Sequence, residues 1–586
     1  EAYRLEAAPG NIVISAATPK GVYYAGQSLA QMLPAAFFNN GVDKKSVSWN
    51  VAVKPFSILD YPRFAWRAFM LDEARHFFGE EEVKRLIDQM GLLKMNVLHW
   101  HLSDDAGWRI QIKKYPKLTS VGGKRRDTEI ETWGSGKYEG RPHEGFYTQE
   151  QVRRIVRYAA DRNITIVPEI DILGHSAAAI VSYPELKLSA RPLAEVPVSF
   201  NDGAAFDPTS ERAYQFLGDI MTELASLFPG GIIHIGGDEV RYKKYWEGVP
   251  HIEAFMKKKG IKTFPDLQIM FTNRISGMLA ERGRRMMGWN EILGSDVHND
   301  GGRGAALGKL DASAIIHFWY GSDKIAAKAI REGRQVVNST SHMTYINKGY
   351  DKLPLSKSYS FEPVFAGLNP EQQKNVIGLG CQVWTEWIAD VEKLHRHVFP
   401  RIAAYAETGW TRKEDKNFQD FRRRLTGYEK ILDALGIRHG GQGGVVTHGA
   451  LGVGDIAHGG DGGIRDDDAL DRLVLHHHLN DPAAVGLLLA VGLHGDAGLQ
   501  RAGKGVGARR IRHIAHAVPM DRKLYLTPVA EHGRNCRRQA QFRLLRPCVH
   551  RERLRGVHRS NLFLAPQRYH HRGLYIRGIS DAPVCR

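Results

Sequence analysis

Cysteine is scarce in this chain of 586 residues. Only four are present, and Cys536, Cys548 and Cys585 all lie in the last quarter, which leaves Cys381 alone in the remainder. A disulfide framework is therefore excluded for the first three quarters, and cysteine usage gives no indication of the redox compartment. Long apolar runs are also missing, because no stretch of about 18 apolar residues occurs. We therefore expect no membrane span.

The first residues lack the pattern of a signal peptide. The opening, EAYRLEAAPGNIVISAA, has no charged segment followed by an apolar one and resembles the middle of a strand pattern. We expect either that a signal and further sequence once preceded this start or that the chain never had them.

Tryptophan is absent after residue 410, and all 11 tryptophans lie at or before that position. From residue 437 onward the chain has 21 arginines, only two lysines and 14 of its 26 histidines, and it holds +11 of the formal net charge of +17. This segment shows neither a helical nor a strand period. One interpretation is a basic appendage that binds nucleic acid, or metal through His476, His477 and His478. We favour the other: residues 437–586 are disordered or frameshift-derived, and nucleic acid is not a partner.

The rest of the chain alternates between short β-rich runs and helical patterns. Eight runs of this kind are present: Arg67 to Arg75, Met95 to Asp105, Ile164 to His175, Gly231 to Glu239, Arg285 to Glu291, Ala314 to Gly321, Gln335 to Ser339, and Val376 to Glu386. Eight strands alternating with helices predict an α/β fold, a (β/α)8 TIM barrel, over residues 59–436. Residues 1–58, with their β-like runs and one helix, predict the C-terminal part of a small α+β domain.

Polar and aromatic residues gather where these runs end. A TIM barrel carries its active site at the C-terminal ends of its strands. The residues predicted at those ends are Asp104, Asp105, Asp171, His175, Asp238, Glu239, Trp289, Trp319, Trp384 and Glu386.

This set of side chains favours sugar chemistry. Tryptophan faces stack on pyranose rings and carboxylates accept hydrogen bonds from hydroxyls. The sequence has neither a phosphate-binding glycine loop nor a clustered metal triad, so no cofactor or metal is predicted. Asp238 and Glu239 are the candidate acids, since two close carboxylates raise the pKa of one of them and keep a proton available near neutrality.

The acidic pair has a simpler alternative, because an Asp-Glu pair after two glycines is more often a solvated turn. Successive strand residues also point to opposite faces. Both acids reach one substrate only if the backbone departs from β geometry, and Gly236 and Gly237 make that departure inexpensive. The other candidates also have structural alternatives. Each Trp is compatible with a position in the core. His175 is compatible with a hydrogen-bonded core histidine, and Arg67 with a surface ion pair.

Several ordered motifs carry a family resemblance. HIGGDE, at His234 to Glu239, resembles the signature of the glycoside hydrolase family 20 β-N-acetylhexosaminidases. WRAFMLDEARHFF, NVLHWHLSDDAGWRI and PEIDILGH resemble that family's first three strand motifs, and GWNE, HFW and WTEW follow in the family's order. The resemblance covers roughly residues 1–436.

The resemblance implies substrate-assisted retaining catalysis. Glu239 would act as general acid and then as general base toward water. The carbonyl oxygen of the substrate's own 2-acetamido group would be the nucleophile and would close to an oxazolinium ion, while Asp238 holds the acetamido N–H. The resemblance assigns the remaining roles as follows: Arg67 to the 3- and 4-hydroxyls, Glu386 to the 4- and 6-hydroxyls, Trp289, Trp319 and Trp384 to the walls of the acetamido pocket, Tyr345 to the acetamido oxygen, and Asp171, His175 and one of Asp104 or Asp105 to positioning the acidic pair.

The chain departs from the family pattern in three places. Ala68 stands where a glycine is common, and Asn347 stands where many relatives have an aspartate two residues after the tyrosine. The second change bears on recognition of the 4-hydroxyl, and so on the choice between gluco and galacto sugars. The upstream domain is also shorter than is usual in the family.

The expected activity is therefore exo-acting removal of terminal β-GlcNAc or GalNAc from an amino-sugar glycan or chitooligosaccharide. Three alternatives remain: release of a disaccharide such as lacto-N-biose, a carbohydrate-binding relative without turnover, and a classical glycosidase with Glu386 as nucleophile. The resemblance implies an extracytoplasmic location, either periplasmic or secreted. Nothing in the sequence indicates the oligomeric state.

Overall fold

The computed structural model describes residues 1–440 except 40, 43–49, 187, 189–192, 201, 296–297 and 299–303. Beyond residue 440 it describes only the backbones of β17 (Arg472–Val474), which pairs with β3 (Asn50–Ala52), and β18 (Arg522–Leu526), which pairs with β2. The segment 437–586 is interpreted as a disordered or frameshift-derived tail. Its first four residues, 437–440, are described, and Ile437 is buried in the main core. The rest of the segment, including the run from His476 to His478, otherwise lies outside the described residues.

The N-terminal segment forms a small antiparallel sheet covered by one helix. β1 (Tyr3–Ala8) lies between β2 (Asn11–Ala16) and β4 (Phe56–Asp60), and α1 (Pro19–Ala30) packs against them. Alternate residues of β1 are buried, as expected for a sheet with one covered face. Trp410, the last residue of α15 (Arg401–Trp410), joins the core of this domain.

The eight predicted strands form a closed parallel barrel, which confirms the predicted fold class. The strands are β5 (Trp66–Asp72), β6 (Val97–His101), β11 (Thr165–Glu169), β12 (Ile232–His234), β13 (Arg285–Trp289), β14 (Ile315–Phe318), β15 (Val336–Asn338) and β16 (Val376–Val383). Each pairs with the next in chain order, and β16 closes the ring on β5.

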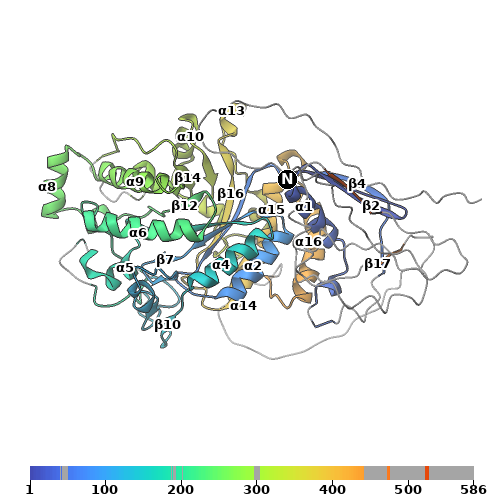
Figure 1. Cartoon of the computed structure of the whole chain (residues 1–586), viewed down its shortest axis with the longest axis horizontal. Helices are drawn as coiled ribbons and strands as arrows, with labels where there is room; N and C mark the ends of the chain where they lie inside the picture. The colour runs from blue at the N-terminus through green and yellow to red at the C-terminus, as the bar shows by residue number, and fades with distance from the viewer. Residues whose placement is uncertain are drawn as a thin grey trace, which may run out of the picture.

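Helices surround the barrel (Figure 1). The longer ones are α2 (Glu80–Leu92), α4 (Gln149–Ala160), α6 (Glu211–Leu227), α8 (Pro250–Lys259), α9 (Phe264–Ala280), α10 (Asp323–Arg331), α14 (Val391–Val398), α15 (Arg401–Trp410) and α16 (Phe418–Ala434). Shorter elements lie in the connections: β7 (Ser103–Asp104), β8 (Gly107–Trp108), α3 (Lys117–Ser120), β9 (Lys124–Arg125), β10 (His143–Glu144), α5 (Ala177–Ser182), α7 (Tyr242–Tyr245), η3 (Asn290–Leu293), α11 (Ser341–Thr344), α12 (Leu355–Ser360) and α13 (Pro370–Gln373). Within the described ranges, no helix has the length and apolarity to cross a membrane.

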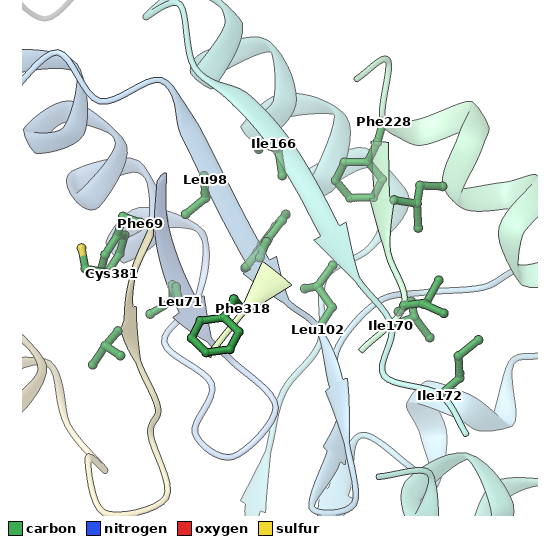
Figure 2. Packing of buried hydrophobic residues seen from close by; sticks show 14 of the residues in the cluster. Phe69, Leu71, Leu98, Leu102, Ile166, Ile170, Ile172, Phe228, Phe318 and Cys381 are labelled. Carbon is green, nitrogen blue, oxygen red and sulfur yellow. The ribbon is translucent and has the colours of Figure 1, made fainter. Parts of the chain in front are cut away.

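Side chains alternate between the two faces of each barrel strand. On β5, Phe69 and Leu71 belong to the large core between strands and helices, where Figure 2 shows Phe69 beside Cys381. Ala68 and Met70 belong instead to two small clusters inside the barrel. This period of two decides which residues of a strand face the helices and which face the barrel interior.

The prediction that Arg67 binds sugar hydroxyls is wrong. Arg67 lies near the start of β5, so the strand rise places it about 16 Å from the site end. Its guanidinium is fully buried, donates to the carbonyls of Lys94 (2.9 Å) and Phe64 (2.6 Å), pairs with Glu1 (2.8 Å), and lies 5.0 Å from the ring centre of Trp410. Arg67 therefore joins the barrel to the small domain.

Replacing Arg67 with methionine is expected to lower stability by about 3–5 kcal/mol, because it strands a buried ion-pair partner and two carbonyls. Urea unfolding measures the loss. Arg63→Met is the matched control, since Arg63 makes a partly exposed pair with Glu362 and should cost about 1 kcal/mol or less. An unchanged stability with a raised KM would restore the sugar-binding role of Arg67.

Candidate functional site

The two predicted acids lie on a sharply turned segment after β12. Gly236 and Gly237 have φ values of +64° and +89°, and Glu239 itself has φ +47°. A Cβ on Gly236 would lie 1.8 Å from Oδ1 of Asp171, so only glycine fits there. The predicted departure from β geometry is therefore confirmed.

His175 lies between two pairs of carboxylates. Its Nδ1 is 3.4 Å from Asp104 Oδ1 and 3.3 Å from Asp105 Oδ2. Its Nε2 is 3.6 Å from Glu239 Oε2 and 4.0 Å from Asp238 Oδ2. The backbone of His175 has φ +48°, an uncommon conformation for a residue with a side chain. The structure thus brings the predicted positioning residues against the acidic pair.

The carboxylates behind His175 are firmly held. Asp105 Oδ1 accepts the backbone N–H groups of Ala177 (2.9 Å) and Ala204 (3.2 Å). Asp104 Oδ2 lies 2.8 Å from the guanidinium of Arg75. On the other side of the acidic pair, Asp171 accepts the N–H of Gly237 at 3.1 Å and so supports the glycine turn.

The pKa values of the two acids differ. Burial alone would lower the pKa of His175, but the charge and hydrogen bond of Asp104 raise it well above its usual value. Burial raises the pKa of Glu239, yet the hydrogen bond and charge of His175 outweigh it and bring that pKa to about 2. Burial raises the pKa of Asp238 to about 7. The pKa values of the two acids therefore move in opposite directions, and burial, more than repulsion within the pair, raises the value for Asp238. Burial and the charge of Asp238 also raise the pKa of the neighbouring Asp171.

Asp238 has an unused acceptor. Its side chain is buried, and Oδ1 has no hydrogen-bond partner among the residues that the structure describes. A buried carboxylate oxygen without a donor is costly, so a donor from a bound molecule would stabilise it. This oxygen points to a ligand that carries an N–H or O–H group.

The predicted aromatic residues form one cluster at the same end of the barrel. Trp289, Trp384 and Tyr345 pack together with Met70, and Trp319 packs against them. Trp319 and Tyr345 are parallel, with ring centres 5.9 Å apart. Burial raises the pKa of the Tyr345 hydroxyl, and the charge of Asp238 raises it further, which places the acidic pair beside this cluster.

Arg75 is the arginine that faces the site, and the sequence prediction missed it. Its guanidinium lies 2.8 Å from Asp104 and 5.0 Å from the ring centre of Trp384. Asp72 positions it by accepting the N–H groups of Ala74, Arg75 and Thr385. Burial raises the pKa of Glu386, and the charge of Arg75 opposes that rise. The position of each arginine along the strand could have identified the one at the site, because Arg75 follows the C-terminal end of β5 and Arg67 lies near its start.

Glu291 is a second residue that the prediction missed, although GWNE was one of the motifs. It accepts the indole N–H of Trp319 at 2.9 Å and lies 3.2 Å from Nε2 of His298. Its charge also contributes to the raised pKa of Asp238. Glu291 therefore orients one aromatic wall and adds negative charge beside the acidic pair.

The fold gathers histidines and acids that are distant in the sequence. Three groups have ligand atoms within 4.8 Å of one another in the described part of the chain: His99, His234 and His317; His101, Glu169 and Asp171; and Asp104, Asp171 and His175. These residues come from different strands and meet only in the barrel, so the sequence shows no clustered metal triad. The hydrogen bonds that these side chains already make determine whether they have a lone pair free for a metal ion.

Comparison with known proteins agrees with this geometry. The profile for "Glycosyl hydrolase family 20, catalytic domain" matches residues 64–413, and the profile for domain 2 of the same family matches residues 1–61. A β-hexosaminidase of Porphyromonas gingivalis is 34% identical over 452 residues, which cover 75% of this chain and 54% of that protein. A β-hexosaminidase of Vibrio furnissii is 35% identical over 377 residues, which cover 61% and 59%.

Solved structures give the same result. The exo-β-N-acetylglucosaminidase of Vibrio harveyi, solved with N-acetylglucosamine, superimposes with a TM-score of 0.62 at 32% identity, covering 75% of this chain and 67% of that chain. The chain spans a little more than half the length of the two curated relatives. Family profiles, sequence identity, the barrel and the acidic pair agree, and the chain belongs to glycosyl hydrolase family 20.

Proposed function

We propose that this protein is an exo-acting retaining β-N-acetylhexosaminidase that removes terminal β-GlcNAc or GalNAc by substrate-assisted catalysis. The observation that carries the proposal is the buried, unpartnered Oδ1 of Asp238 beside the Trp289, Trp384 and Tyr345 cluster. A 2-acetamido group supplies both the N–H that this oxygen lacks and the apolar methyl group that such a cluster accepts.

The two acids would act on different parts of one sugar. Glu239, with about a third of its side chain exposed, protonates the glycosidic oxygen as the C1–O bond breaks. The acetamido carbonyl oxygen attacks C1 and closes an oxazolinium ring, whose N–H⁺ is stabilised by the carboxylate of Asp238. Water then attacks C1 as the bond between C1 and the acetamido oxygen breaks, which restores the 2-acetamido group. Glu239 takes the proton of the water, and the configuration at C1 is retained.

This scheme requires a redistribution of the proton when the sugar binds. In the free site the proton lies on Asp238, and Glu239 is ionised beside His175. An acetamido N–H that donates to Asp238 favours its carboxylate form, and a sugar that covers Glu239 favours that residue's neutral form. We propose that the proton passes to Glu239 on binding. His175 Nε2, within 4.0 Å of both carboxyl groups, holds the two side chains in place for this exchange.

The hydroxyls of the terminal sugar would meet Arg75 and Glu386. These two groups carry opposite charges and lie beside Trp384, whose ring provides a stacking face for the pyranose. Asn347 Oδ1, buried and without a partner among the described residues, offers a further neutral acceptor. We propose a terminal amino sugar of a glycan or chitooligosaccharide as the substrate. We also propose, from the family resemblance alone, that the protein meets it outside the cytoplasm.

The test compares p-nitrophenyl β-GlcNAc with p-nitrophenyl β-glucoside, which differs only at the 2-position. We expect turnover of the first and a rate near the blank for the second, because the glucoside lacks the internal nucleophile. Proton NMR of the first sugar released should show the β-anomer. A protein that cleaves both substrates equally is a classical glycosidase, and one that binds GlcNAc but cleaves neither has only a binding function. Release of an intact disaccharide from a lacto-N-bioside would indicate that the enzyme removes disaccharide units.

A further inference from the structure

A layer of polar side chains crosses the interior of the barrel beneath the aromatic cluster. His234 from β12 and His317 from β14 are fully buried, and so are Ser339, directly after β15, and Gln382 from β16. The mechanism proposed above uses none of them. Buried polar groups persist in a barrel interior only when they are hydrogen-bonded, so their partners reveal their role.

The hydrogen bonds run in one direction through this layer. The backbone N–H of Gly236 donates to Nδ1 of His234 at 3.0 Å, which makes that nitrogen an acceptor. Oε1 of Glu169, which accepts the indole N–H of Trp289 at 2.9 Å, lies 3.1 Å from the same nitrogen. His234 therefore carries its proton on Nε2 and donates it to Nδ1 of His317, 3.3 Å away. His317 in turn carries its proton on Nε2 and donates to Ser339 Oγ at 2.7 Å.

The far end of the chain is anchored in β16. Ser339 Oγ donates to the carbonyl of Gly380 at 3.1 Å and accepts from the amide of Gln382 at 2.7 Å. The Gln382 carbonyl oxygen accepts from Thr344 at 3.0 Å, one residue before Tyr345. Every donor in this series thus has an acceptor, and the series links the glycine turn to the strand that carries Trp384.

The imidazole of His317 is neutral in this arrangement. Burial lowers the pKa of His317 well below its usual value, and the adjacent His234 and His99 lower it further. Neutral rings allow one nitrogen to donate while the other accepts, which an imidazolium cannot do. His317 also stacks on Trp289, with ring centres 4.2 Å apart and planes 20° from parallel.

We propose that His317 is a positioning residue for the reaction: it fixes the tautomer of His234 and thereby holds the Gly236–Gly237 turn from which Asp238 and Glu239 project. The proposal rests on the proposed function for its kinetic test. A metal ion is the competing occupant of the His99, His234 and His317 group. Both nitrogens of His234 and of His317 are already used in hydrogen bonds, which leaves no lone pair on either ring for an ion.

The kinetic test replaces His317 with phenylalanine, which keeps a ring against Trp289 and removes both nitrogens. We expect kcat to fall about 10²-fold with KM changed little, since a small misplacement of reacting groups has that cost. His317→Asn should recover part of kcat, because Oδ1 can replace the Nδ1 acceptor. Ser339→Ala, which removes the acceptor for His317, should lower kcat in the same direction. The control is Cys381→Ala, a buried change on the outer face of β16.

A second measurement needs neither a variant nor activity. Nitrogen NMR of the whole protein labelled with ¹⁵N-histidine should show His317 neutral and the ring protons of both His234 and His317 on Nε2. A proton on Nδ1 of either ring, or a stoichiometric metal in the purified protein, would overturn the proposal. Correct tautomers together with equal kcat in His317→Phe and the wild type would also overturn it. Tautomers as expected in a protein that does not cleave the GlcNAc substrate would instead contradict the proposed function alone.

Discussion

Glu239→Gln is expected to lower kcat/KM for chitobiose by about 10²–10⁴-fold, the usual contribution of a general acid. Glutamine keeps the shape of the side chain and cannot supply a proton to the glycosidic oxygen. The loss should be smaller for p-nitrophenyl β-GlcNAc, because nitrophenolate departs without protonation. The ratio between the two substrates therefore reports the acid role separately from the later role of Glu239 as base.

Glu247→Gln is the matched control, since Glu247 is exposed on the segment that follows the acidic pair. It should retain wild-type rates on both substrates. Equal losses on both substrates in Glu239→Gln would argue against proton donation to the leaving group. Azide offers a further check, because a small anion can replace the missing base in the second step and should restore turnover of the activated substrate only.

Asp238→Asn is expected to lower kcat by about 10²–10³-fold, the cost of losing one preorganised electrostatic group. Asparagine can still occupy the space but cannot neutralise the oxazolinium N–H⁺. The variant should be at least as stable as the wild type above pH 7, since it removes a buried carboxylate whose pKa folding raises to about 7. Such a group favours the folded state at low pH, and its contribution is lost as pH rises through that value. A lower Tm together with lost activity would indicate structural damage instead.

The same variant should change the pH dependence. Wild-type kcat/KM should fall as pH rises through about 7, because the single proton of the pair is then lost and none can pass to Glu239. In Asp238→Asn only Glu239 can hold that proton, and its pKa beside His175 is about 2. The fall of kcat/KM with rising pH should therefore move to acid pH. A limb that stays near pH 7 would show that another group supplies the proton.

The barrel could be predicted because its signals are local. Each run of β-branched and apolar residues followed by a helical pattern is readable within about twenty residues, and eight such units leave few ways to close a sheet. The site end was predictable for the same reason, since chemistry in this fold follows the C-terminal ends of strands. Asp238, Glu239, His175 and the three tryptophans all follow that rule, and the structure brings them together.

Arg67 and Arg75 show where local signals fail. Both lie in one motif, and residue type alone makes them equivalent. The choice depends on strand alternation and on which barrel end each residue reaches, which places one arginine against Trp410 and the other against Trp384. Glu291 and the His234–His317–Ser339 series were likewise hidden, because their partners come from different strands.

The order of the strands, the class of fold, the acidic pair and its aromatic surroundings were thus determined by the amino-acid sequence alone, through periodicity and neighbouring residues. Only the closed barrel decided which arginine faces the site, which of the two acids has the raised pKa, and which groups the buried histidines contact. The physical reason is that hydrogen bonding, burial and charge depend on distances between side chains, and here hydrogen bonds join residues as far as 350 positions apart.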